Sequence, residues 1–249
     1  ELQSRRIKIL RDSVAQKIAA GEVIDRPFSV VRELLDNSID AGAGSIDVHV
    51  EEGGLRKIRV IDDGVGMTRD DLELCYLPHA TSKITSAGDI YRLETLGFRG
   101  EALPSIASVS RLTLVSRPAG QPSGTEIKVE GGRILKVTET GAPPGTLVAV
   151  RDLFFNTPAR RKFLKTVATE MGHIGDGLAS LALGHPEIDF RLVHNGKTTR
   201  RWPAVSDPAD RVADVLGRAL QDELFPIALE SEAAAVSGWV ASPRVNRST

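Results

Sequence analysis

The sequence predicts an α+β fold, a two-layer α/β sandwich in which one layer of helices covers a mostly antiparallel, mixed sheet. Short strands with alternating apolar residues follow one another in hairpin order, at residues 45–62 and again through residues 111–153. The predicted helices stand in groups between these runs of strands. A dinucleotide-binding fold, in which single strands and helices alternate, is therefore disfavoured.

The composition excludes several classes of protein. The 249 residues carry a net charge of −1, with 41% hydrophobic and 26% charged residues, as in an ordinary soluble globular chain. The single cysteine, Cys75, allows no internal disulfide and no cysteine-based zinc site, and it is interpreted as a buried, inert thiol. The five histidines show no HxxxH or HxH spacing. No apolar run approaches about 18 residues, so we expect no membrane span and a cytoplasmic, reducing location.

The chain begins with two predicted helices. The first ends near Gly21, and the second starts at Pro27, with Asp25 as a nearby candidate for its N-cap. Two strands come next, at Ser45–Glu51 and Lys57–Asp62, and the residues EEGG between them are typical of a hairpin turn. A β-hairpin is therefore expected directly after the second helix.

A long polar connection separates this hairpin from the later strands. The glycine loop DDGVGM and a helix at residues 68–77 come first. The stretch from Pro78 to about Leu96 is a candidate lid, because connections of this length inside a compact domain are usually functional or mobile. A helix then begins within GFRGEALPSIASVS. The remaining predicted elements are strands at 111–117, 125–131, 133–139 and 145–153, a helix at 169–184, and a strand at 188–202.

A domain boundary is predicted near Ser206. There two prolines and several acidic residues precede a new helix. Residues 1–205 would form the first domain, and residues 206–249 the beginning of a second α/β domain. Some 43 residues are too few for a core of their own, so we expect the chain to stop inside that second domain.

A polar stripe on the second helix suggests a functional site. Glu33, Asn37 and Asp40 share one side, since positions i, i+4 and i+7 lie on the same helix face. The simple alternative is a solvated face, but such faces usually pair Glu with Lys or Arg, and Asn is a poor helix former. An amide oxygen is a hard ligand suited to Mg²⁺, and a carboxylate one turn away can orient or deprotonate a water that attacks a phosphate.

Three further segments could complete such a site. In DDGVGM, Asp62 ends a strand and can accept a hydrogen bond from an exocyclic amine, while the glycines allow close approach of the backbone. Between His79 and Leu103, glycines precede a helix N-terminus, where backbone amides can bind phosphate. In GTLVAVRDLFFNTPARRKFL, Thr146 could reach a base or a water. The first of these segments has a plain structural alternative as a surface turn, and the last has alternatives as a strand start and a solvated basic helix.

Taken together, the segments resemble the N-terminal ATPase region of the MutL family of DNA mismatch repair proteins. That family lies within the superfamily of gyrase B subunits, histidine kinases and ninety-kilodalton heat-shock chaperones. GFRGEAL and LFFNTPARRKFL are highly specific to MutL-like proteins, whereas the superfamily motifs alone are moderately specific. The resemblance is carried, from Gln16 to Lys197, by QKIAAGEVIDRPFSVVRELLDNSIDAGA, DDGVGM, HATSKI, LGFRGEAL, GTLVAVRDLFFNTPARRKFL and HNGK.

The resemblance implies a nucleotide lying between the sheet and a flexible lid. Glu33 would be the general base, Asn37 would bind Mg²⁺, and Asp62 would bind the adenine amino group. The other residues that it places at ATP are Gly64, Gly66, Met67 and Thr146 beside Asp62, then Thr81, Ser82 and Lys83 in the lid, and Gly97, Phe98, Arg99 and Gly100 around the phosphates.

The implied activity is slow, Mg²⁺-assisted hydrolysis of ATP to ADP and phosphate. ATP binding would bring two N-terminal regions together as a homodimeric clamp. The implied partners are the mismatch-recognition protein MutS and DNA, which would be bound weakly and mainly non-specifically. In a bacterium such a protein would be cytoplasmic and associated with the nucleoid.

The sequence departs from the family pattern at three positions. Asp36 and Asp63 stand where relatives often carry Glu and Asn, and Pro78 precedes HATSKI where a basic residue is usual. The family's second domain supplies a lysine to the terminal phosphate, and this chain ends before that segment. Weak hydrolysis is therefore expected even where ATP binds.

Two alternatives stay open. In one, the chain is a binding module for DNA or a protein partner, and nucleotide is only structural. In the other, it is a fragment of a gyrase-like topoisomerase, which the wording of the glycine loop disfavours. The residues that would carry the first alternative are Arg160, Arg161, Lys162 and Lys165.

Overall fold

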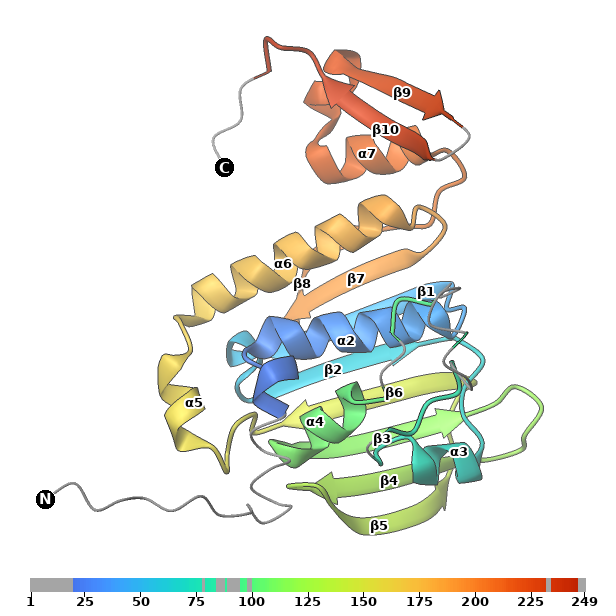
Figure 1. Cartoon of the computed structure of the whole chain (residues 1–249), viewed down its shortest axis with the longest axis vertical. Helices are drawn as coiled ribbons and strands as arrows, with labels where there is room; N and C mark the ends of the chain where they lie inside the picture. Colours follow the sequence, from blue (N-terminus) through green and yellow to red (C-terminus); the bar gives the residue numbers. More distant parts are fainter. Residues whose placement is uncertain are drawn as a thin grey trace, which may run out of the picture.

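The computed structural model describes residues 20–77, 79–83, 88, 95–97, 100–231 and 234–245. Two predicted site residues, Phe98 and Arg99, and also Pro78, lie outside this described part. An eight-stranded sheet forms the main body of the molecule (Figure 1). Its strands are β1 (Ser45–Glu51), β2 (Lys57–Asp62), β3 (Arg111–Arg117), β4 (Gly124–Glu130), β5 (Arg133–Thr140), β6 (Gly145–Arg151), β7 (Asp189–His194) and β8 (Lys197–Trp202).

The sheet is mixed but mostly antiparallel, as predicted. Its strand order is β5-β4-β3-β6-β2-β1-β7-β8, and only the β1–β7 pair is parallel. In the β2–β6 pair, Asp62 lies opposite Thr146. Two residues far apart in the sequence, both predicted to contact the same nucleotide, are therefore neighbours at one end of the sheet.

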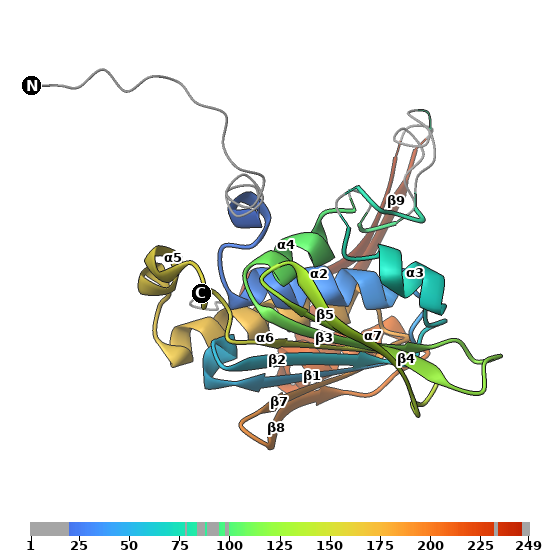
Figure 2. The same ribbon diagram turned by 90° about the horizontal axis from the view of Figure 1, so that it is seen from below.

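Helices cover one face of the sheet. Figure 2 shows α2 and α4 on the same side of the strands. Helix α6 packs beside α2 and against β7, while α3 packs against β4. This is the single helical layer expected from the sequence. The helices of this part of the chain are α2 (Pro27–Asp40), α3 (Arg69–Leu74), α4 (Ala102–Ser108), α5 (Pro158–Phe163) and α6 (Val167–Gly184).

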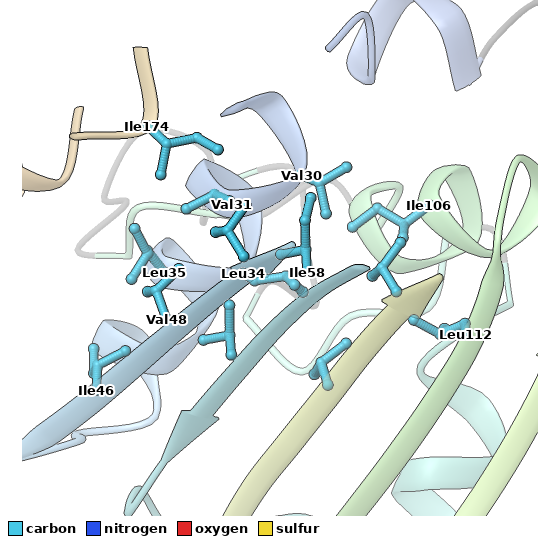
Figure 3. Close-up of a cluster of buried hydrophobic side chains, with 14 of the residues drawn as sticks. Val30, Val31, Leu34, Leu35, Ile46, Val48, Ile58, Ile106, Leu112 and Ile174 are labelled. Carbon is cyan, nitrogen blue, oxygen red and sulfur yellow. The ribbon is translucent and has the colours of Figure 1, made fainter. Parts of the chain in front are cut away.

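The core between helices and sheet fixes the position of α2. The helix turns Val31, Leu34 and Leu35 toward Ile46 and Val48 of β1, and all five side chains are fully buried or nearly so (Figure 3). Each such side chain contributes about 1.5–3 kcal/mol through removal of apolar surface from water. Because the apolar face is held in this way, the polar edge of α2 is held in a defined direction as well.

Several local predictions need correction. Residues 188–202 form two strands, because Asn195 and Gly196 both take positive φ, of 49° and 81°, and turn the chain back on itself. EEGG is no simple turn, since Glu52–Gly54 form a short 3-10 helix, η1. Arg26, and not Asp25, occupies the N-cap of α2, while the Asp25 carboxylate accepts a hydrogen bond from the Ser29 hydroxyl.

The last part of the chain packs on the main body through one buried arginine. Arg211 is fully buried, and its guanidinium donates to the carbonyl oxygens of Ala182 at 2.8 Å, Ile188 at 2.9 Å and Pro203 at 2.7 Å. It thereby joins α7 to the end of α6 and to the β7–β8 hairpin. The elements of this part are α7 (Pro208–Leu216), η3 (Arg218–Glu223), β9 (Leu224–Glu230) and β10 (Ala235–Ala241), the two strands forming a separate sheet.

The domain boundary near Ser206 stays a prediction.

Among the described helices, none has the length and apolar character needed to cross a bilayer.

Candidate functional site

Helix α2 presents the predicted polar stripe. Glu33, Asn37 and Asp40 are half-buried on the helix, whereas the neighbouring Leu34 and Leu35 are fully buried. Pro27 stands at the start of the helix, where its missing N–H costs nothing, and the chain turns after Asp40 through Gly42, which has a φ of 69°. The stripe is therefore a partly enclosed polar edge and differs from a fully solvated helix face.

Asp62, at the end of β2, is 9% exposed and lies at the centre of a hydrogen-bond cluster. Its Oδ2 accepts from the Ser38 hydroxyl at 2.8 Å, and its Oδ1 accepts from the amides of Gly64 at 3.1 Å and Thr146 at 3.2 Å. Burial raises the pKa of Asp62 above its ordinary value of 3.8, and these hydrogen bonds oppose the shift. A carboxylate offers about four acceptor positions, so one remains for a donor such as an exocyclic amine.

The glycine loop passes close to this carboxylate. A Cβ on Gly64 would lie 2.8 Å from the carbonyl oxygen of Ala41 and 3.1 Å from Asp62 Oδ1. Gly66 has a φ of 72°, and a Cβ there would lie 2.4 Å from the carbonyl oxygen of Arg117. Glycine is therefore required at both positions by the close approach of the backbone to Ala41 and Arg117.

Met67 and Thr146 meet through a third residue, Ser116. The amide of Met67 donates to Ser116 Oγ at 2.8 Å, and the hydroxyls of Ser116 and Thr146 are 2.8 Å apart. Ser116 is 1% exposed. The glycine loop, β3 and β6 are thereby joined at the end of the sheet where Asp62 lies.

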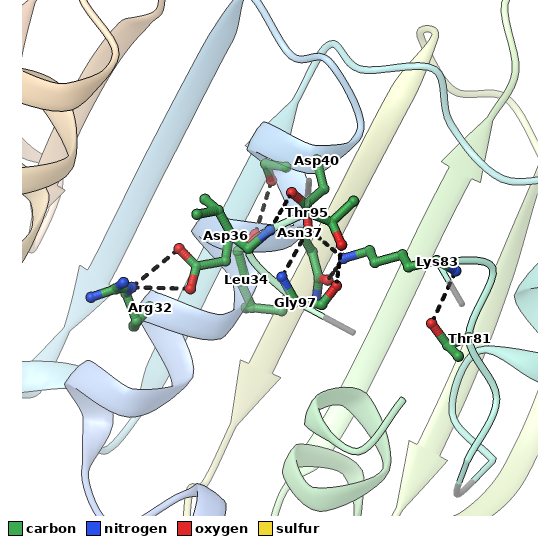
Figure 4. A network of polar contacts seen from close by, with 11 residues as sticks. Arg32, Leu34, Asp36, Asn37, Asp40, Thr81, Lys83, Thr95 and Gly97 are labelled. Atoms are coloured by element: carbon green, nitrogen blue, oxygen red, sulfur yellow. Dashed lines mark hydrogen bonds and ion pairs between the residues drawn. The ribbon is translucent and has the colours of Figure 1, made fainter. Parts of the chain in front are cut away.

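A second cluster gathers beside Asn37 (Figure 4). Lys83 Nζ donates to Asn37 Oδ1 at 3.0 Å and to Asp40 Oδ2 at 2.6 Å. Gly97 completes the cluster, since its amide donates to Asp40 Oδ2 at 3.1 Å and a Cβ on it would lie 3.2 Å from Lys83 Nζ. Segments from two ends of the predicted lid region therefore meet on α2.

The remaining predicted residues lie near this second cluster. Thr81 Oγ1 accepts from the Lys83 amide at 3.1 Å, whereas Ser82 is exposed. Gly100 has a φ of 62°, and a Cβ there would lie 2.6 Å from the carbonyl oxygen of Ala80. Gly100 precedes α4 by two residues, as expected for a loop that leads into a helix N-terminus.

The two clusters are joined by α2. Ser38 bonds Asp62 in the first cluster, and the adjacent Asn37 bonds Lys83 in the second. One end of this edge of α2 therefore lies beside the Asp62 carboxylate, which suits a base amine. The other end lies beside the polar atoms around Asn37, which suit phosphates and a cation. Glu33 lies one turn before Asn37 on the same helix.

Sequence reasoning missed three residues of these clusters. Ser38 lies in the second predicted helix and Ser116 in the predicted strand at 111–117, and neither was singled out. Asp40 was named in the polar stripe but was given no role. A signal existed for the serines, since each places a polar side chain at a position that periodicity assigns to the core. The clusters show why they are there: both hydroxyls satisfy buried polar partners.

The amide oxygen beside Lys83 suits Mg²⁺. Asn37 Oδ1 is a hard ligand, and the ammonium of Lys83 already stands against it as a cation. Within the described residues, no group of three or more His, Cys, Asp or Glu side chains could by itself hold a metal. A cation here would therefore need ligands from water or from a bound phosphate.

Two hollows of the structure lie away from both clusters. One, of about 240 Å³, is lined by Arg26, Arg160 and Glu170, and the other, of about 320 Å³, lies between α7 and the β9–β10 hairpin. The space beside Asn37 is instead filled by Lys83 and Gly97.

Comparisons with known sequences identify close relatives. Residues 25–136 match the family described as histidine kinase-, DNA gyrase B-, and HSP90-like ATPase. The DNA mismatch repair protein MutL of Syntrophotalea carbinolica is 50% identical over 98% of this chain, and that of Geobacter sulfurreducens is 52% identical over 98%. The chain spans 39% and 40% of the length of these two relatives.

Solved structures show the same similarity in the fold. The Aquifex aeolicus MutL ATPase domain complexed with ADP aligns with a TM-score of 0.66 and 36% identity, over 83% of this chain and 73% of that one. A second structure, of the ATPase domain of the Aquifex aeolicus mismatch repair endonuclease MutL, aligns with a TM-score of 0.66 and 31% identity, over 91% and 75% of the two chains.

Proposed function

Since the chain belongs to the MutL family of DNA mismatch repair proteins and has the fold of their ATPase domain, we propose that it binds ATP together with Mg²⁺ and hydrolyses it slowly. The observation that carries this proposal is the Asp62 cluster. A carboxylate that is 9% exposed and already holds three donors stands beside the glycine loop, with one acceptor position left for a base amine. The ADP complex of the Aquifex aeolicus relative supports a nucleotide as the ligand.

In this proposal Asp62 accepts a hydrogen bond from the adenine amino group. Gly64 and Gly66 would let the backbone of the glycine loop lie close to the base. Met67 and Thr146, which both hydrogen-bond Ser116, would lie beside it. An accepting carboxylate favours adenine over bases that carry a carbonyl oxygen at this position.

At the other end, Asn37 Oδ1 would hold Mg²⁺, which when bound would neutralise charge on the phosphates. Glu33, one helical turn away, orients the attacking water and accepts its proton. The residues that would surround the phosphates are Thr81, Ser82, Lys83, Gly97, Phe98, Arg99 and Gly100.

Beyond nucleotide chemistry, the proposed role is that of a clamp in mismatch repair. ATP binding would bring two copies of this region together, and the closed dimer would couple recognition by MutS to later steps on DNA. Such a role places the protein in the cytoplasm at the nucleoid. Residues 206–249 would begin the second domain that transmits the nucleotide state, a role in keeping with the tie that Arg211 makes to α6.

Glu33→Gln separates binding from hydrolysis. The amide keeps the size of the side chain but cannot accept a proton, so we expect ADP affinity by calorimetry to stay within about twofold and ATP turnover to fall by at least about 100-fold. Asp36→Asn, on the same helix and paired with Arg32, is the matched control and should retain turnover. Wild-type turnover in the Glu33 variant would refute the assignment of the base.

Light scattering tests the clamp. The molar mass of the protein should be that of a monomer in buffer alone, and it should double when a non-hydrolysable ATP analogue and Mg²⁺ are added. A monomer under both conditions would leave an ATPase without nucleotide-dependent dimerisation.

One observation favours DNA binding as a second candidate function. On and beside α5, Phe163 is 82% exposed, and Arg161, Lys162 and Lys165 are exposed around it. An exposed ring among cations suits stacking on unpaired bases as well as contact with phosphates. Single-stranded DNA should bind with strong salt dependence, and Lys162→Glu should weaken it, with or without nucleotide. Affinity that is independent of salt would contradict this candidate.

A further inference from the structure

Asp40 connects two separate segments of the loop region to α2 through three donors. Its carboxylate accepts from Lys83 Nζ at 2.6 Å, from the Leu96 amide at 2.9 Å and from the Gly97 amide at 3.1 Å (Figure 4). The Asp40 side chain is only 7% exposed, and that of Lys83 is 20% exposed. This ion pair is therefore shielded from solvent, unlike a surface salt bridge, and holds a defined geometry.

The same ammonium contacts the proposed metal ligand. Lys83 Nζ lies 3.0 Å from Asn37 Oδ1, so it occupies the side of the amide oxygen that a cation would approach. Gly97 closes over it, because a Cβ on that residue would lie only 3.2 Å from Nζ. An ammonium and a divalent cation cannot both sit against this oxygen, since two positive charges at such short range repel strongly.

Resting on the proposed function, we infer that Asp40 is a positioning residue that holds Lys83 in the place of the metal while no nucleotide is bound. Binding of nucleotide with Mg²⁺ exchanges one cation for the other: the ammonium leaves Asn37 and Asp40 and turns to the phosphate oxygens. Part of the free energy of nucleotide binding therefore offsets the cost of breaking the Lys83–Asp40 ion pair. Asp40 thus lowers affinity for nucleotide and keeps Asn37 neutralised until Mg²⁺ arrives.

The experiment is a double-mutant cycle on ADP affinity, measured by calorimetry with Mg²⁺ and again with EDTA. Asp40→Asn keeps an acceptor oxygen for one of the two loop amides, which donate to different oxygens of Asp40, and loses the charge that holds Lys83. We expect it to tighten Mg²⁺–ADP binding by about fivefold, as for the loss of an ion pair that binding must otherwise break. In the Lys83→Met background, Asp40→Asn should change the affinity by less than about twofold, because no ammonium remains to be held.

Three results would overturn the inference. Asp40→Asn could weaken ADP binding or leave it unchanged, or it could tighten binding equally in the Lys83→Met background. The matched control is Asp36→Asn, whose carboxylate pairs with Arg32, and it should leave ADP affinity unchanged. If the Asp40 variant does not fold, Lys83→Met alone decides: the ratio of ADP affinity with Mg²⁺ to that with EDTA should rise, and an unchanged ratio refutes the exchange.

Failure of the proposed function gives a different result. In that case the wild-type chain binds no ADP under either condition. If only this inference fails, the wild-type chain still binds ADP, and the Asp40→Asn variant does not show the expected tightening.

Discussion

Asp62→Asn changes one oxygen of the carboxylate into an amino group and leaves the shape of the side chain unchanged. Asn Oδ1 can keep the amides of Gly64 and Thr146, which both donate to a single oxygen of Asp62. The new amino group replaces Oδ2, and the Ser38 hydroxyl can rotate to accept from it. The folded structure should therefore tolerate the change, with a loss of no more than about 1 kcal/mol in the free energy of unfolding.

Nucleotide binding should respond very differently. An adenine amino group would meet a second donor where Asp62 offered an acceptor. The loss combines a hydrogen bond to a charged group with an unsatisfied donor, at least about 3 kcal/mol together, which corresponds to an affinity lower by about 100-fold. Calorimetry with ADP measures it directly.

Inosine diphosphate provides the internal control, since it carries a carbonyl oxygen in place of the amine. Wild type should reject it, and Asp62→Asn should partly accept it, so the preference for ADP should fall by about 100-fold. Equal loss of affinity for both nucleotides would indicate general damage to the site. Undiminished ADP affinity would refute the assignment of Asp62.

The same variant makes a prediction about pH. Burial raises the pKa of Asp62 in the folded chain above its ordinary value of 3.8. The folded state therefore holds this proton more tightly, so the contribution of Asp62 to stability is greatest below about pH 4 and is lost as pH rises through the folded pKa. As pH rises from 4 to 7, wild type should therefore lose stability relative to Asp62→Asn, so the free energy of unfolding of the variant should increase relative to that of wild type. A difference that is constant over this range would contradict the raised pKa.

Two further predictions concern stability and reactivity. Arg211→Met removes the donors of several buried carbonyls and should lower the free energy of unfolding by at least about 3 kcal/mol in urea; Arg218→Met, whose side chain is 83% exposed, should change it by less than about 0.5 kcal/mol. Burial raises the pKa of Cys75 to about 12, so alkylation by iodoacetamide at pH 8 should be at least about 100-fold slower in the folded chain than in urea. Equal rates would show that the thiol is accessible and ionised.

The clusters show where sequence reasoning ended. Asn37, Asp62 and Thr146 were placed by motif and by their position in predicted elements, and the structure brings Asp62 and Thr146 together across β2 and β6. Lys83 was assigned to a lid. Its hydrogen bond to Asn37 could not be predicted, because the two residues are 46 positions apart in the chain and no local sequence pattern relates them. Whether ATP is the ligand of these residues stays a proposal.

Periodicity by itself determined the strands, the apolar face of α2 and the polar stripe beside it, because each depends on side chains that alternate within one element. Only the tertiary structure decided which strands are neighbours, that β7 runs parallel to β1, and that the serines at 38 and 116 satisfy buried partners. It also gave Asp40 its three donors. Such contacts join residues distant in the chain, and their geometry is fixed by the packing of whole elements, which no local spacing encodes.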